Sequence, residues 1–188
     1  MSHTNRRQIL IDRMESLEAQ GFGCKGCSGT CCTYEANSMM VTPLEAFELL
    51  HYLKNNNLLD ESLKNKISGT VTQYRLDHQF GNGKRSYLRR TYTCPFFNHQ
   101  ELGCPLPRDI KPYGCLAFNA HHETEKAGVH CHSEPVLLMK REEVDSNEEA
   151  LNSQLKEKFK LLWDKSPLPS ALINIWDMKI TDADLELD

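Results

Sequence analysis

The sequence lacks the long apolar runs and the basic charge that mark two large classes of protein. No apolar stretch approaches the ~20 residues of a membrane helix or the ~7–15 residues of a signal-peptide core. The first one, Ile9–Ile11, is followed at once by Asp12 and Arg13. Lysine and arginine are scattered and the formal net charge is −4, so no strongly basic face is expected. We therefore expect a cytoplasmic protein that binds neither membrane nor nucleic acid.

Motifs of common catalytic chemistry are missing as well. The chain has no glycine-rich phosphate loop, no dinucleotide-binding fingerprint and no Ser-His-Asp order. Hydrophobic residues make up 39% of the 188 residues and charged residues 26%. These values are typical of a globular chain of ordinary size with a hydrophobic core, not of a disordered one.

Cysteine is the residue type in excess, with eight of 188 residues. The cysteines are Cys24, Cys27, Cys31, Cys32, Cys94, Cys104, Cys115 and Cys131. The first four form C-x2-C-x3-C-C, in which a Cys-x2-Cys turn directs two sulfurs to the same side, within reach of one ion. The other four each lie beside a proline, glycine or histidine. In a reducing compartment such a set favours metal or cluster binding over a disulfide framework or isolated buried thiols.

The apolar spacing predicts several helices and one strand. Helices are expected over about 5–19, over about 61–77 and around 172–178. A fourth helix is expected to begin at the capping box Thr42-Pro43-Leu44-Glu45 and to end near residue 55. A fifth is expected to begin at the capping box Ser146–Glu149, with an apolar face formed by Leu151, Leu155, Phe159 and Leu162. A strand is expected over 85–93. Residues 94–135 contain five prolines and little periodicity, so we expect them to be irregular and organised by metal ligation. The charged run 140–149 is expected to be a solvated surface, and the acidic tail to be loose.

These patterns predict a mainly helical α+β fold, a single domain with a cysteine-rich, irregular metal-binding lobe. Along the chain we expect an N-terminal helix at 1–21, a cysteine-cluster metal-binding domain at 22–135, and a C-terminal helical extension with an acidic tail at 136–188. The helices at 43–54 and 147–164 have their own caps and apolar stripes, and are expected to pack on each other.

The segment Cys24-Lys25-Gly26-Cys27-Ser28-Gly29-Thr30-Cys31-Cys32 resembles the opening motif of the YkgJ-type cysteine-cluster domain, a zinc- or iron-chelating domain. Further family positions are matched by Thr42-Pro43-Leu44-Glu45, Cys94-Pro95-Phe96, Cys104, Lys111-Pro112, Cys115 and Cys131. The resemblance covers about residues 22–132. The sequence departs from the family pattern at Pro105-Leu106-Pro107, where an Ile-Tyr step is common, and at Lys111 and Leu116, where arginine is common.

The residues and the resemblance together predict that all eight cysteines hold zinc or an iron–sulfur cluster. Eight thiolates suffice for two four-coordinate ions or for one cluster and one ion, and Cys31 or Cys32 is expected to point away from its neighbour's site. The histidines nearby are His99, His121, His122, His130 and His132. We expect these histidines to lie at the surface or to donate hydrogen bonds to the metal ligands. If the site contains histidine as well as cysteine ligands, His130 and His132 are the expected ones.

Three functions remain open at this point. The first is a structural metal domain that acts as an interaction module for a protein partner. The second is an iron–sulfur-dependent redox or protein methyl-transfer enzyme, which the resemblance implies because a similar domain occurs in flagellin lysine N-methylases. The third is metal storage or delivery.

Overall fold

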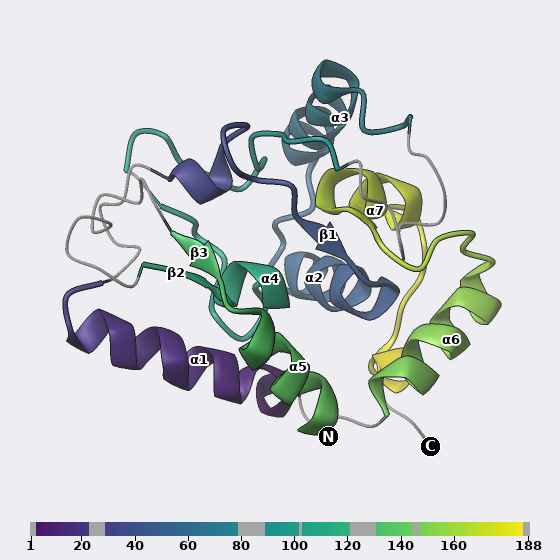
Figure 1. The fold of residues 1–188 in the computed structure, drawn as a ribbon. Helices are drawn as coiled ribbons and strands as arrows, with labels where there is room; N and C mark the ends of the chain where they lie inside the picture. Colours follow the sequence, from purple (N-terminus) through teal and green to yellow (C-terminus); the bar gives the residue numbers. More distant parts are fainter. Residues whose placement is uncertain are drawn as a thin grey trace. The chain divides into compact units, whose positions relative to one another are not determined.

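The computed structural model describes residues 3–22, 29–78, 89–101, 103–120, 131–144 and 147–185. Within these ranges the protein is mainly helical, as predicted, with seven α-helices and two small two-stranded sheets (Figure 1). None of these helices is long and apolar enough to cross a membrane. The chain divides into two compact units, each formed from two stretches of sequence. We call Met1–Asn37 with Thr91–Asp145 the cysteine unit, and Ser38–Arg90 with Ser146–Asp188 the helical unit.

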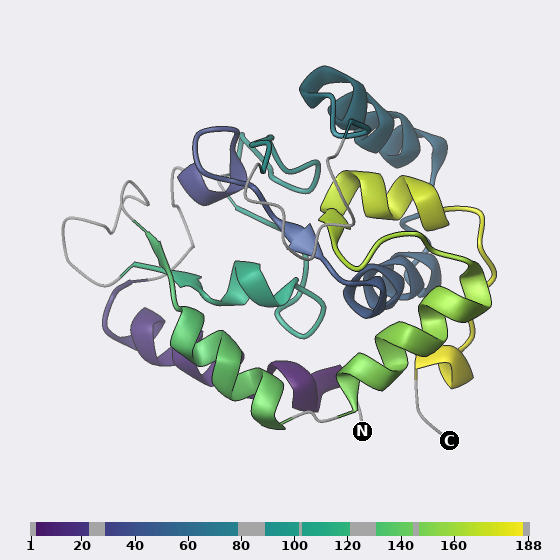
Figure 2. The same ribbon diagram turned by 45° about the vertical axis from the view of Figure 1, so that its right-hand side comes forward.

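The cysteine unit is formed by short elements around one long helix. They are α1 (His3–Ala19), the 3-10 helix η1 (Thr30–Cys32), α4 (Tyr113–Leu116), β2 (Phe118–Asn119), β3 (His132–Ser133) and α5 (Pro135–Val144). Helix α1 packs against α4 and α5, which run beside it in both ribbon views (Figures 1 and 2). Strands β2 and β3 pair antiparallel, with Phe118 opposite Ser133.

The predicted N-terminal helix is confirmed, and its apolar face forms the core of this unit. Leu10 and Met14 are buried against Leu116 and Ala117, and Leu137 of α5 packs on the same cluster. This packing explains why α5 is a helix where the sequence suggested a solvated charged surface. Leu137 and Leu138, just before the charged run, pack against the α1 cluster, and such burial stabilises a helix of weak intrinsic signal.

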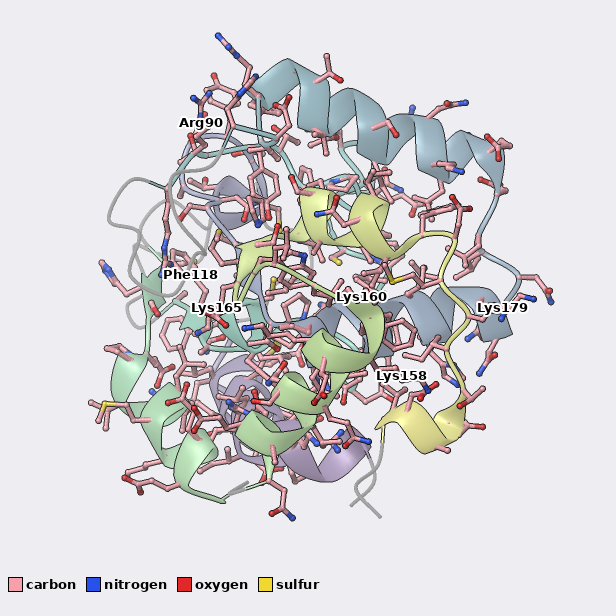
Figure 3. The ribbon with its side chains drawn as sticks, turned by 90° about the vertical axis from the view of Figure 1, so that its right-hand side faces the viewer. Arg90, Phe118, Lys158, Lys160, Lys165 and Lys179 are labelled. Carbon is pink, nitrogen blue, oxygen red and sulfur yellow. The ribbon has the colours of Figure 1, made fainter. Side chains whose placement is uncertain are left out.

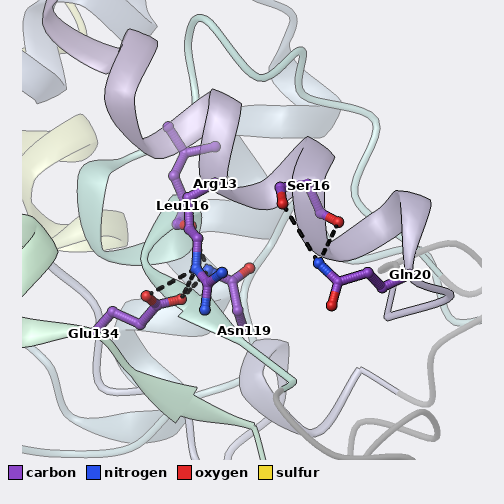
Figure 4. Close-up of polar contacts among 6 residues, drawn as sticks. All are labelled: Arg13, Ser16, Gln20, Leu116, Asn119 and Glu134. Atoms are coloured by element: carbon purple, nitrogen blue, oxygen red, sulfur yellow. Dashed lines mark hydrogen bonds and ion pairs between the residues drawn. The ribbon is translucent and has the colours of Figure 1, made fainter.

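A polar network joins the same three elements at their edge (Figure 4). Arg13 of α1 donates through Nε to both carboxylate oxygens of Glu134, at 3.3 and 3.1 Å. Asn119 donates through Nδ2 to the Leu116 carbonyl at 3.0 Å and to Glu134 Oε1 at 3.2 Å. These hydrogen bonds connect Glu134, which precedes α5, to α1 and, through Asn119, to the end of α4.

Within its described residues, the helical unit contains four helices of eight or more residues, and each of them buries apolar side chains. Its elements are β1 (Met40–Val41), α2 (Pro43–Asn55), α3 (Glu61–Tyr74), α6 (Glu148–Phe159), β4 (Ser166–Pro167), α7 (Leu168–Ile175) and the 3-10 helix η3 (Asp182–Leu185). Helix α2 packs on α6 and α7, and α3 packs on α7. The predicted packing of the two capped helices is thus confirmed, with the Phe47 and Phe159 rings 4.6 Å apart. Strands β1 and β4 pair antiparallel, with Val41 opposite Ser166.

The predicted start of α2 is confirmed in detail. The Glu45 amide donates to Thr42 Oγ1 at 3.3 Å, and the Thr42 amide donates to Glu45 Oε2 at 2.8 Å. This reciprocal capping box satisfies donors that the first turn of a helix leaves unpaired. The Leu44 amide donates to Asn152 Oδ1 at 2.9 Å, which attaches α6 to the same end of α2.

Several predicted boundaries are wrong. The strand expected over 85–93 begins outside the described residues, and Arg89–Thr93 belong to no strand. Helix α6 begins after Asn147 and ends at Phe159, because Lys160 adopts a left-handed φ of 55°. Leu162, expected on its apolar face, is therefore 92% exposed.

Two further boundaries differ from the sequence-based prediction. Helix α3 ends at Tyr74, where Arg75 takes a φ of 52°, and α7 begins at Leu168. The acidic tail is partly ordered, since Leu185 is buried in η3. The buried Asp184 side chain of η3 accepts a hydrogen bond from the Lys158 ammonium. Lys158 and Lys160 both lie near the C-terminal end of α6 (Figure 3).

Candidate metal centre

The cysteines are confined to one of the two units. All six that the structure describes belong to the cysteine unit, as half-buried thiols. They are Cys31, Cys32, Cys94, Cys104, Cys115 and Cys131. The predicted ligands Cys24 and Cys27 lie outside the described residues. The sequence of the helical unit contains no cysteine, so the two units differ completely in thiol chemistry.

Backbone hydrogen bonds join the first cysteine segment to the segment that carries Cys94. The Cys94 amide donates to the Cys32 carbonyl at 2.7 Å. Two residues earlier, the Tyr92 amide donates to the Asn37 carbonyl at 2.9 Å, and Asn37 Nδ2 donates to the Tyr92 carbonyl at 3.0 Å. Because the Asn37 side chain replaces a backbone partner, residues 91–94 are held alongside 32–37 without forming a strand ladder.

A close contact between Gly29 and Phe97 fixes the same two segments. Gly29 has a φ of +76°, and a Cβ placed on it would lie 2.1 Å from Phe97 Cζ. Only glycine allows both this left-handed backbone and this approach of an aromatic ring. The Phe97 ring also makes a T-shaped contact with the His99 ring, and the two ring centroids are 4.7 Å apart.

A tight loop separates Cys94 from Cys104. Asn98 and Gly103 form an antiparallel bridge, with the Asn98 amide donating to the Gly103 carbonyl at 2.8 Å. Inside the loop, Asn98 Oδ1 accepts from the Gln100 amide at 3.0 Å, an Asx-type turn. The loop is thus closed a few residues after Cys94 and directly before Cys104.

Cys115 reaches the cysteine unit from α4. Its amide donates to the Pro112 carbonyl at 2.9 Å in the first turn of this helix. The neighbouring residues Tyr113 and Leu116 are buried in the core beneath α1. Tyr113 lies under two guanidinium groups, with Arg7 Cζ 4.7 Å and Arg141 Cζ 3.8 Å from its ring centroid. Helices α1 and α5 therefore hold the position of Cys115 through its neighbours.

The electrostatics show that thiols from separate segments share one environment. Cys31 Sγ and Cys32 Sγ are 4.0 Å apart, and this contact, together with burial, raises the pKa of Cys31 far above its ordinary value. Burial also raises the pKa of Cys115, followed by the charges of Cys94, Cys104 and Cys31. Lys111 acts in the opposite direction on both thiols. Cys115 thus interacts with cysteines from three other segments.

The described side chains do not converge on a single ion-sized point. Among the residues the structure describes, no group of three or more histidine, cysteine, aspartate or glutamate side chains has the arrangement of a metal site. Cys131 lies just before β3, and His132 in that strand is exposed, as is His99. The remaining candidate histidines, His121, His122 and His130, lie outside the described residues.

The comparisons with known proteins add no relative. No family model, curated protein or solved structure matches this chain. The resemblance to the YkgJ-type domain therefore stays a prediction that depends on the order and spacing of the cysteines.

The thiol environment has a definite chemical consequence. Burial and mutual repulsion keep thiols such as Cys31 and Cys115 protonated when no cation is near. A soft divalent cation reverses this preference, because it binds the thiolate and displaces the proton. A group of thiols that disfavour one another's charge, held by bonds between distant segments, is chemically suited to a thiophilic metal. The sequence analysis identified these thiols. It did not identify Gly29, Asn37 and Phe97, whose contacts hold the thiol-bearing segments together, because no periodic pattern in the sequence marks them.

Proposed function

We propose that this protein binds zinc or an iron–sulfur cluster through its cysteines, as a structural metal domain that presents the cysteine unit to a protein partner. The metal ligands would come from Cys24, Cys27, Cys31, Cys32, Cys94, Cys104, Cys115 and Cys131. A reducing compartment such as the cytoplasm suits this role, because it keeps the thiols available.

The observation that supports the proposal most strongly is the gathering of thiols from distant segments. Cys32 and Cys94 are joined through their backbones at 2.7 Å. Cys115, more than eighty residues after Cys31, shares an electrostatic environment with Cys31, Cys94 and Cys104. Thiols from four separate sequence segments therefore act on one another within the cysteine unit.

Ligation would also explain how this unit is ordered. Apart from α1 and α5, its elements are at most four residues long, too short to be stable alone. Structural zinc contributes roughly 10–16 kcal/mol of folding free energy in small peptides. We propose that the metal supplies the stabilisation that longer helices would otherwise give to residues 94–120.

The first test is metal analysis of the protein purified under reducing conditions without oxygen. We expect zinc or iron in stoichiometric amount. Visible absorption with bound iron and sulfide would identify a cluster, and a colourless zinc protein would identify a structural ion. A folded, fully reduced protein that holds neither metal, and that takes up no added zinc, would contradict the proposal.

A pair of variants tests the ligand assignment. Cys115→Ser should lower the metal content by about one site and weaken the fold, because a hydroxyl is a poor ligand for zinc or iron. His99→Ala serves as the control, since His99 is exposed and touches only the edge of Phe97 in its described ring contacts. If His99→Ala empties a site while Cys115→Ser keeps all its metal, the thiol assignment is wrong.

A further inference from the structure

We propose that Asn37 is a positioning residue of the cysteine site, which sets Cys94 beside Cys32 so that these two thiols bind the same metal ion. This inference rests on the proposed function and adds two things to it, a residue that is not itself a ligand and a pair of ligands that share one ion. Asn37 acts on the site through the backbone of Tyr92, to which its side chain and its carbonyl group are both bonded.

The bonds between Asn37 and Tyr92 are buried. Asn37 Nδ2 donates to the Tyr92 carbonyl at 3.0 Å, and the Tyr92 amide donates to the Asn37 carbonyl at 2.9 Å. Asn37 is 4% exposed and Tyr92 is fully buried. Losing a buried hydrogen bond is costly, because water cannot replace the missing partner there. Asn37 therefore fixes the backbone two residues before Cys94.

The alignment of the two segments continues to the thiols. The Tyr34 amide donates to Thr93 Oγ1 at 3.3 Å, and the Cys94 amide donates to the Cys32 carbonyl at 2.7 Å. Residues joined by backbone hydrogen bonds in a sheet have Cα atoms about 5.5 Å apart. Cysteines at such a separation bring their sulfurs to about 2 Å in a disulfide. Two sulfurs on one tetrahedral zinc are only about 3.8 Å apart, since each Zn–S bond is about 2.3 Å. Side-chain rotation alone can thus bring both thiols to one ion.

A second contact holds the same pair from its other side. Gly29 precedes Cys32 by three residues, Phe97 follows Cys94 by three, and the Phe97 ring lies against the Gly29 backbone. The pairing of the two cysteines is therefore set by the register of two antiparallel segments between two fixed points. A substitution of Asn37 releases one of these points, while the Gly29–Phe97 contact keeps the segments together.

The shared ion is tested by alkylation of the reduced, zinc-loaded full-length chain with iodoacetamide, measured at each cysteine by peptide mass spectrometry. A thiolate bound to zinc is protected, so a thiol that loses its ion reacts faster. Cys32→Ser should accelerate the alkylation of Cys94 at least about tenfold, and Cys94→Ser should do the same to Cys32. Each variant removes one ligand of the ion on which the other thiol depends.

The positioning role is tested by Asn37→Ala in the same assay. It should accelerate the alkylation of Cys32 and Cys94 together and weaken zinc binding about 10–100-fold, which is typical of losing an outer partner of a metal ligand. Asn37→Asp keeps the size of the side chain but lacks the amide donor, and should act in the same direction. The matched control is Asn119→Ala, because Asn119 is also 4% exposed and donates Nδ2 to a backbone carbonyl, that of Leu116, at 3.0 Å in the same unit. The control should leave Cys32 and Cys94 protected.

The outcomes separate this inference from the proposed function. If the wild type binds zinc and Cys94 stays protected in Cys32→Ser, the two thiols do not share an ion, while metal binding stands. If Asn37→Ala accelerates every cysteine equally, or if Asn119→Ala exposes Cys32 and Cys94 to the same extent, the effect is a general loss of stability and the positioning role is wrong. A wild type whose thiols zinc does not protect overturns the inference together with zinc binding.

Discussion

The two units of this protein reach an ordered structure by different means. In the helical unit, α6 and α7 each pack on α2, and α2 and α3 start at side-chain caps provided by Thr42 and Asp60. In the cysteine unit, α1 and α5 also pack on each other, but the segments that carry Cys32 and Cys94 are joined by a few hydrogen bonds and by the Gly29–Phe97 contact. Periodic apolar faces, which are local features of the sequence, specify the helical unit, whereas the cysteine unit depends on contacts between distant segments.

Natural probes distinguish the two units in one experiment. Trp163 and Trp176 both belong to the helical unit, and every described cysteine belongs to the cysteine unit. Tryptophan fluorescence therefore reports on the helical unit and thiol accessibility on the cysteine unit.

Metal removal should give the largest difference between the units. With a strong chelator under reducing conditions, we expect amide hydrogen exchange at Cys94, Phe97 and Cys115 to accelerate at least about 100-fold, because ligation is proposed to supply most of their order. Amides of α2 and of residues 151–155 should keep their protection. Equal acceleration in both units would show that they fold as one cooperative body, and no acceleration would show that metal does not hold the cysteine unit.

Two glycine substitutions sharpen the comparison at smaller scale. Gly29→Ala forces a Cβ to within 2.1 Å of Phe97 Cζ at a φ of +76°, so it should destabilise the cysteine unit by roughly 1–3 kcal/mol. Gly69→Ala is the matched change within α3, where a Cβ meets nothing within 4 Å. It should stabilise the helical unit by about 0.5–1 kcal/mol.

Urea unfolding measures both glycine variants with the two probes. Gly29→Ala should lower the midpoint of thiol exposure and leave the tryptophan midpoint in place, and Gly69→Ala should raise the tryptophan midpoint alone. A shift of both midpoints by the same amount in either variant would break the distinction between the units.

The smallest expected effect is the pH dependence of the tail contact in the helical unit. Burial alone would raise the pKa of Asp184. Hydrogen bonds from the Lys158 ammonium, and from the Thr181 amide and hydroxyl at 2.9 Å each, outweigh burial and lower that pKa. A lowered folded-state pKa stabilises the fold above the unfolded value of about 3.9, and this stabilisation is lost as the pH falls through the folded-state pKa.

Asp184→Asn should therefore lower the free energy of unfolding by up to about 1 kcal/mol at neutral pH, with no difference from the wild type once the carboxyl group is protonated. Tryptophan fluorescence in urea at several pH values measures this. Asp177→Asn is the control, because Asp177 is 88% exposed in its pair with Lys64. Equal pH profiles for Asp184→Asn and the wild type would contradict the assignment.

Much of the helical unit could be predicted from local sequence. Thr42, Pro43 and Glu45 specify the start of α2, and the apolar residues Leu151 and Leu155 place α6 against it. These signals extend over one or two helical turns, so they can be recognised without knowing the structure of the rest of the chain. The ends of α3 and α6 could not be predicted, because ordinary residues, Arg75 and Lys160, take the left-handed conformation there.

The sequence by itself determined that cysteine is in excess and which eight residues carry the thiols, because cysteines in glycine- and proline-rich segments are recognisable without coordinates. Only the tertiary structure decided that the described cysteines share one unit, that Asn37 joins the segments of Cys32 and Cys94, and that Gly29 must accept the Phe97 ring. The physical reason is that these contacts join residues 55 or more positions apart. No local pattern encodes such a pairing, which becomes favourable only once the two segments have come together.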